Sequence, residues 1–140
     1  MSLPSRPAST SSEAETVLFD LVDVYERAYE AAAATLGLSP AQACLLGRLY
    51  EPCGMGALAE ELGCDASNIT QIVARLEALG LAVREPNPQD RRARIVVRTP
   101  QGDEMNQRFA KAFTFGRTAV ERLTPDEQNQ LTALLRKALG

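Results

Sequence analysis

Apolar residues recur every three or four positions through the first part of the chain, which is the spacing of amphipathic helices. Between Glu15 and Leu36 they alternate with acidic residues. Ser39 and Pro40 then form a helix start, because serine caps free backbone N–H groups and proline fits the first helical position. The pattern predicts a first helix over 15–36 and a second that ends near Tyr50.

Two shorter amphipathic segments follow, Met55–Leu62 and Ala66–Leu79. Between them, Gly63, Cys64 and Asp65 form a tight turn in which the glycine ends one helix and the aspartate caps the next. Two helices joined by a short turn that contains glycine are the pattern of a helix-turn-helix unit.

After Gly80 the pattern changes. Leu81–Glu85 and Ala93–Arg98 are predicted strands, and residues 86–92 between them are rich in proline and other turn formers. A β-hairpin directly behind a helix-turn-helix is a wing.

Helical spacing returns at Thr99 and Pro100, which begin one long predicted helix whose apolar stripe reaches Leu123. Thr124–Glu127 is a capping box for a last helix. The predicted fold class is mainly α with a small β-hairpin (α+β), a winged helix-turn-helix core flanked by N- and C-terminal helices. The predicted divisions are a disordered tail over 1–14, an N-terminal helix over 15–38, the winged core over 39–99 and C-terminal helices over 100–140.

The composition excludes several kinds of catalytic and metal-binding site. The 140-residue chain has no histidine, which excludes a Ser-His-Asp triad, a histidine metal site and an imidazole pH switch. Glycine-rich phosphate loops and paired carboxylates are also missing, so we expect no enzyme, no metal and no cofactor. Three cysteines without an export signal favour reduced thiols in the cytoplasm. No apolar run approaches about eighteen residues, so we expect no membrane span.

Charge is distributed unevenly along the chain. The net charge is −3, which by itself argues against a nucleic-acid partner. Residues 67–98, however, contain six arginines and three acids, a local charge of +3, whereas residues 13–30 contain one arginine and six acids, a local charge of −5. Positive charge therefore gathers where a helix-turn-helix and its wing would contact DNA.

The outward face of the helix over 66–79 is polar when its apolar stripe faces the core. Short amide and hydroxyl groups near the N-terminus of a helix, with an arginine further along, suit the bases and phosphates of the major groove. The alternative is an ordinary solvated helix face. The candidate DNA-reading residues are Ser67, Asn68, Thr70, Gln71 and Arg75.

The hairpin carries a cluster of arginines: Arg84, Arg91, Arg92, Arg94 and Arg98. Arginine suits phosphate contacts and insertion into a narrow minor groove. The residues alone leave two alternatives open. One is a charged hairpin with internal ion pairs, and the other is a winged-helix protein–protein adaptor that meets an acidic partner without DNA binding.

Four motifs carry a resemblance to a known family: Leu58-Ala59-Glu60-Glu61-Leu62-Gly63, Arg75-Leu76-Glu77-Ala78-Leu79-Gly80-Leu81, Asn87-Pro88-Gln89-Asp90-Arg91-Arg92-Ala93 and Thr99-Pro100-Gln101-Gly102. Over Ser39–Gly102 the chain resembles the multiple antibiotic resistance regulator (MarR) family of winged-helix repressors. The helical motifs are general to winged helices, whereas the Asp-Arg-Arg wing followed by Thr-Pro-x-Gly is specific to the family. Arg98 departs from the family pattern, which usually has an aliphatic residue there.

The resemblance implies a homodimer held by the helices over 15–38 and 100–140, which binds double-stranded DNA at a palindromic operator as a repressor relieved by a small molecule. By the family pattern Arg92 enters the minor groove and Asp90 orients it. Arg91 and Arg94 match backbone contacts, and the five residues of the helix face match groove-reading positions.

The resemblance also suggests what the switch senses. Family members respond to small aromatic or phenolic ligands, for which Tyr25, Tyr29 and Phe113 are candidate pocket residues, although their helical spacing equally fits a core or dimer interface. Other members respond to cysteine oxidation. Cys53, which Pro52 and Gly54 could leave exposed, is the candidate for a redox-sensing alternative, although no cationic residue lies next to it in the sequence to activate its thiol. Cys44 and Cys64 are expected to be small buried hydrophobic residues.

Overall fold

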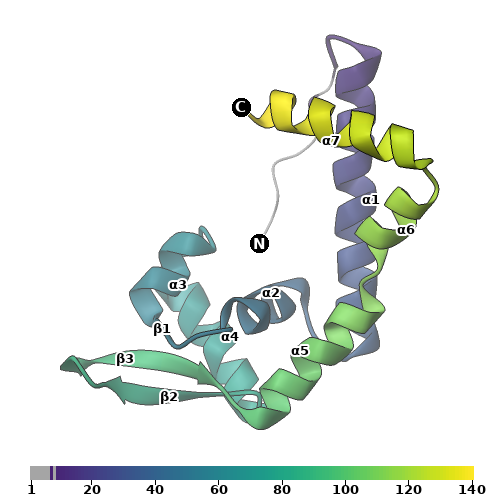
Figure 1. Ribbon diagram of the computed structural model, residues 1–140. Coiled ribbons are helices and arrows are strands. Elements are labelled where there is room, and N and C mark those ends of the chain that lie inside the picture. The colour runs from purple at the N-terminus through teal and green to yellow at the C-terminus, as the bar shows by residue number, and fades with distance from the viewer. Residues whose placement is uncertain (1–6, 8) are drawn as a thin grey trace.

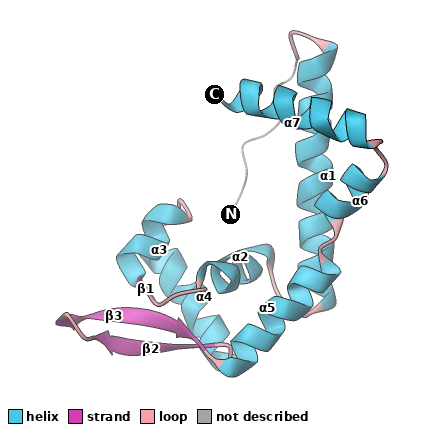
Figure 2. Ribbon diagram, in the orientation of Figure 1, coloured by secondary structure: helices cyan, strands magenta, loops and turns pink. Residues whose placement is uncertain are grey.

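A computed structural model of the chain describes Pro7 and residues 9–140 (Figure 1). The elements, in chain order, are α1 (Glu13–Thr35), α2 (Pro40–Arg48), β1 (Cys53–Gly54), α3 (Met55–Glu61), α4 (Ala66–Ala78), β2 (Ala82–Asn87), β3 (Asp90–Arg98), α5 (Pro100–Ala112), α6 (Phe115–Glu121) and α7 (Pro125–Leu139). Helices dominate, and the three strands lie together on one side of the molecule (Figure 2). The predicted fold class is confirmed.

Side-chain caps set the start of most helices. The hydroxyl oxygen of Ser12 accepts from the backbone N–H of Glu15, so α1 begins at Glu13, inside the tail predicted over 1–14. Residues 1–6 and 8 of that tail lie outside the described residues. Ser39 and Thr124 form the predicted capping boxes of α2 and α7, because each hydroxyl and the glutamine or glutamate three residues later satisfy each other's backbone N–H.

The sheet has the order β1-β3-β2, and both pairings are antiparallel. The strands of the wing are longer than predicted, since they continue to a two-residue turn at 88–89. Pro86 is tolerated because β2 is an edge strand, where a missing N–H costs no ladder bond. Strand β1 was not predicted, because two residues that pair Cys53 with Val96 are too few to show alternation.

The hydrophobic core lies within the winged unit. Its fully buried large side chains come from α2, α3, α4 and β3: Leu45, Leu46, Leu58, Ile69, Val73, Leu76 and Val96. Figure 1 shows α2–α4 and the hairpin as one lobe, from which α5 leads back to the long α1. This packing fixes the orientation of α4 and the wing.

The single long helix predicted over 99–123 is wrong, because it breaks between α5 and α6. Phe113 has φ −92 and ψ 88, outside the helical region. Residues two apart on a continuous helix point to opposite sides, whereas the break lets Phe113 and Phe115 stack, with ring centroids 6.4 Å apart, and both meet the edge of Tyr25. Burial of two aromatic rings on the same side of α1 therefore explains the interruption.

The junction between the wing and α5 is tightly built. Arg98 donates from Nε to Asp103 at 2.6 Å and from a terminal nitrogen to the carbonyl oxygen of Leu46 at 3.0 Å. A Cβ on Gly102 would lie 2.1 Å from the carbonyl oxygen of Leu81, so only glycine fits there. Arg98 thus joins the end of β3 to α2 and α5, a polar role where the family pattern has an aliphatic residue.

Candidate nucleic-acid interface and neighbouring cavity

Helix α4 has an exposed polar face and, opposite it, a buried apolar face. Gly63, with φ +62, ends α3 and turns the chain so that α4 packs across it. Ile69, Val73 and Leu76 are fully buried beneath α4. The opposite face is exposed at every candidate DNA-reading position, which are Ser67, Asn68, Thr70, Gln71 and Arg75. The structure therefore brings these five residues together on one accessible surface.

Hydrogen bonds at the start of α4 engage some of these groups. Asp65 caps the helix, and its Oδ1 accepts from the backbone N–H of Asn68 at 2.8 Å and from the hydroxyl of Ser67 at 2.9 Å. These two hydrogen bonds lower the pKa of the Asp65 carboxyl, so it is ionised at neutral pH. The hydroxyl of Thr70 donates back to the carbonyl oxygen of Ala66 at 2.8 Å.

The five hairpin arginines separate into two groups. Arg84 pairs with Glu77 of α4 at 2.7 Å, and Arg98 pairs with Asp103 of α5. These two arginines join the wing to its neighbouring helices, as the ion-pair alternative supposed. Arg91, Arg92 and Arg94 are exposed, and no carboxylate of the described residues forms an ion pair with them. Three uncompensated positive charges therefore lie toward the tip of the wing.

Asp90 acts on the backbone of Arg92. Its Oδ1 accepts from the N–H of Arg92 at 3.1 Å, which is the local turn that an aspartate commonly forms two residues ahead. Asn87 accepts from the N–H of Gln89 in the same way at 3.0 Å. The tip is thus shaped by side-chain-to-backbone hydrogen bonds, which leave the guanidinium of Arg92 unengaged by Asp90.

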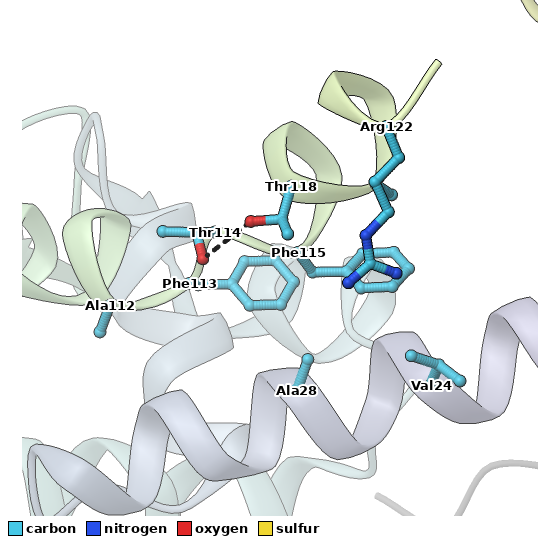
Figure 3. Close-up of a pocket in the computed structure, with 9 residues that line it drawn as sticks. Val24, Ala28, Ala112, Phe113, Thr114, Phe115, Thr118 and Arg122 are labelled. Atoms are coloured by element: carbon cyan, nitrogen blue, oxygen red, sulfur yellow. Dashed lines mark hydrogen bonds between the residues drawn. The ribbon is translucent and has the colours of Figure 1, made fainter.

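A second feature is a cavity of about 250 Å³ between α1 and the break of α5 and α6 (Figure 3). Phe113 and Phe115 supply aromatic wall, and Thr114, Thr118 and Arg122 supply polar groups. The remaining lining residues are Val24, Ala28, Ala112 and Ala119.

Of the three predicted pocket residues, only Phe113 lines this cavity. Tyr25 and Tyr29 belong to the adjoining aromatic cluster, in which Tyr29 lies 4.9 Å from Phe109 and 5.1 Å from Phe113 between ring centroids. Burial raises the pKa of the Tyr29 hydroxyl, and the neighbouring Cys44 adds to this. The sequence pattern missed Phe115 and Arg122, because neither lies on the apolar stripe of a continuous helix and only the break turns them toward the cavity.

The cysteines differ from expectation. Cys53, expected to be exposed, is buried, since β1 pairs it with the central strand. Burial raises the pKa of its thiol; the positive charge of Arg48 opposes this shift, and the carboxylates of Glu61 and Glu51 add to it. Cys44 and Cys64 are half-buried where full burial was expected. Cys53 is therefore not an exposed thiol, which a redox-sensing role would require.

Two other kinds of feature are absent from the described part of the chain. Among residues 9–140 no group of three or more histidine, cysteine, aspartate or glutamate side chains is arranged to hold a metal ion. In the same residues no helix has the length and apolar character needed to cross a membrane.

Comparison with known proteins agrees with this geometry. A model of the MarR family matches residues 36–93. The uncharacterised HTH-type transcriptional regulator YkoM of Bacillus subtilis is 33% identical over 106 residues, which cover 73% of this chain and 68% of YkoM.

Solved structures share the fold. Wild-type apo MarR of E. coli superposes with a TM-score of 0.79 at 23% identity, covering 94% of this chain and 100% of that one. A Staphylococcus aureus MepR mutant bound to an oligodeoxyribonucleotide superposes with a TM-score of 0.67 at 21% identity, covering 92% and 97%.

Proposed function

The chain belongs to the MarR family of DNA-binding transcriptional regulators, and from this we propose that it is a homodimeric repressor that binds a palindromic operator and is released by a small ligand. The observation that carries the proposal is one accessible surface. The polar face of α4 and the uncompensated arginines of the wing belong to one lobe, to which ion pairs and a shared core hold them rigidly.

Exposed apolar side chains support the dimer. Leu18 of α1 and Leu134 of α7 are 52% and 66% exposed, and α7 has no buried residue at all. Monomeric proteins rarely leave such contiguous apolar helix faces in water. A second copy related by a two-fold axis would cover the same faces on both chains.

The dimer sets the form of the operator. Two α4 helices enter successive major grooves on one side of the duplex only if they lie about one helical turn apart, roughly 34 Å. In each half-site the exposed residues of α4 contact base edges, while Arg92 enters the minor groove and Arg91 and Arg94 contact phosphates. Asp90 fixes the backbone from which the Arg92 side chain extends.

The cavity supports ligand control. It is small and mostly apolar, with a few polar groups, which suits a small aromatic or phenolic molecule. It lies where α5 meets α6, so a ligand that prefers another angle between these helices would favour dimers with another spacing of α4. DNA affinity falls when that population grows.

The test is footprinting of the purified protein on the DNA that flanks its own gene, followed by anisotropy titration of the protected duplex at several salt concentrations. We expect a protected palindrome and a steep loss of affinity with added salt, because bound phosphates release counterions. Absence of duplex binding at low salt would instead favour the adaptor that meets an acidic protein.

A further inference from the structure

The exposed polar residues of α4 differ in which hydrogen-bond donors and acceptors they have free for a base. The hydroxyl hydrogen of Ser67 is donated to Asp65, and that of Thr70 is donated to the carbonyl oxygen of Ala66. Each hydroxyl has only one hydrogen. Both side chains therefore retain acceptor lone pairs alone, and neither can donate to a base or phosphate without breaking a bond it already has.

The first turn of α4 is also closed to phosphate. A helix N-terminus ordinarily attracts phosphate through its free N–H groups. Here the Asp65 carboxylate occupies the N–H of Asn68, and the lowered pKa of Asp65 keeps a negative charge at this end. The Asp65 carboxylate thus competes with phosphate at the N–H of Asn68, so the side chains further along the face are the better candidates for DNA contact.

Two side-chain amides on this face remain fully available. Asn68 and Gln71 are exposed, and neither amide group has a hydrogen-bond partner among the described residues. An amide that keeps both its donor and its acceptor matches the major-groove edge of adenine, which offers N7 as acceptor and the N6 amino group as donor. Guanine offers two acceptors at this edge and suits arginine, so Arg75 does not compete for adenine.

The spacing of the two amides fixes which bases they reach. Asn68 and Gln71 are three residues apart, so they are neighbours on one face of α4 with Cβ atoms roughly 5–6 Å apart. Successive bases of one strand are about 3.4 Å apart along the duplex. The two amides therefore reach neighbouring base pairs.

We infer that Asn68 and Gln71 are the specificity-determining pair and that each operator half-site contains adenines at two neighbouring base pairs, one read by each amide. This inference rests on the proposed function, since it assumes that α4 enters the major groove. It assigns Ser67 and Thr70 no part in the choice of base at these two positions.

Binding-site selection from a random duplex pool tests the assignment, with the full-length wild-type protein and four variants. Adenine should be enriched at two neighbouring positions of each half-site. Asn68→Ala should lose the preference at one position and Gln71→Ala at the other, each by about ten-fold or more. Ser67→Ala and Thr70→Val change the two engaged hydroxyls of the same exposed face. Whatever they do to overall affinity, both should keep the two base preferences. Circular dichroism checks that each variant is folded.

A modified base tests the chemistry directly. Replacing one of the two adenines by 7-deazaadenine removes the N7 acceptor, which should weaken wild-type binding at least about five-fold and leave unchanged the variant that lacks the matching amide. Retention of both preferences by Asn68→Ala and Gln71→Ala, or selection of other bases at these positions, overturns the inference while the proposed function stands. Failure of the wild-type protein to bind any duplex overturns the proposed function as well.

Discussion

Leucine side chains of α2–α4 and those of α7 lie in opposite environments within one chain. Leu45 and Leu58 are fully buried in the winged core, whereas Leu134 and Leu139 are 66% and 87% exposed. The core of the winged region comes mainly from α2, α3, α4 and β3. Helix α1 adds the fully buried Ala33, and partly buried residues of α1 and α5 pack against the core. The outer helices α1, α6 and α7 form amphipathic helices but bury little of their apolar faces.

The two regions differ in whether one chain buries their apolar side chains. The winged lobe keeps its core and the Arg84–Glu77 ion pair within one chain. The outer region has the pattern of half an interface. Changes in the two regions should therefore have different consequences for assembly, stability and DNA binding.

The largest effect is expected from a charge in the exposed apolar face. Leu134→Glu should weaken dimerisation by roughly 3–6 kcal/mol, since each dimer loses two buried leucine side chains. Sedimentation velocity should show a monomer. Urea titration should show that this monomer still unfolds cooperatively, because the winged core lies within one chain. Asn129→Asp, at an exposed position on the opposite face of the same helix, adds a negative charge outside the apolar face and should remain dimeric. A dimeric Leu134→Glu protein would remove α7 from the interface.

A cavity in the winged core should act differently. Leu45→Ala should lower the free energy of unfolding by about 2–5 kcal/mol, because the fully buried side chain leaves a space that its neighbours fill only in part. Urea titration should give the same loss at every protein concentration. A loss that depends on concentration would mean that this core is completed by the partner chain.

The wing should affect DNA binding without affecting assembly. Arg92→Ala should weaken operator binding by roughly 1–3 kcal/mol, as expected for an arginine in a narrow minor groove, and leave the sedimentation coefficient unchanged. Lys137→Ala removes the same charge from α7 and should leave affinity nearly as in the wild type. Anisotropy titration of the footprinted duplex measures both variants, and equal affinities would exclude the wing from the contact.

Substitutions at the junction between the wing and α5 should have a smaller effect. Arg98→Leu restores the aliphatic residue of the family pattern but leaves the Leu46 carbonyl without its charged donor. We expect a loss of about 1–2 kcal/mol in urea unfolding, typical of a lost hydrogen bond to a half-buried group. Asp103→Ala, which removes only the more exposed partner, should cost less, and the reverse order would contradict the assigned role of the Leu46 contact.

Regular periodicity explains what the sequence could predict. The capping residues Ser39, Asp65 and Thr124 mark helix starts, and alternation marks the hairpin, so the winged fold and the exposed face of α4 were accessible from local pattern alone. The break at Phe113 was not, because it depends on stacking against Tyr25 from a distant helix. For the same reason the division of the wing arginines into paired and unpaired groups needed Glu77 and Asp103 placed in space.

The smallest effect is expected at Cys53, and it separates a structural thiol from a sensor. Burial raises the pKa of this thiol above its ordinary value near 8.5, so the protonated form dominates at neutral pH and the nucleophilic thiolate is scarce. A raised pKa in the folded state means that its contribution to stability is complete below the unfolded pKa and is lost as pH rises through the folded value. Stability should therefore decline above about pH 8.5, and Cys53→Ala should flatten part of that decline.

At pH 7, iodoacetamide should label Cys53 more slowly in the folded protein than in urea, and peroxide should affect DNA binding of Cys53→Ala and wild-type protein equally. Rapid labelling of Cys53 in the folded protein at pH 7, or a peroxide response lost in Cys53→Ala, would instead support a redox-sensing role for this residue.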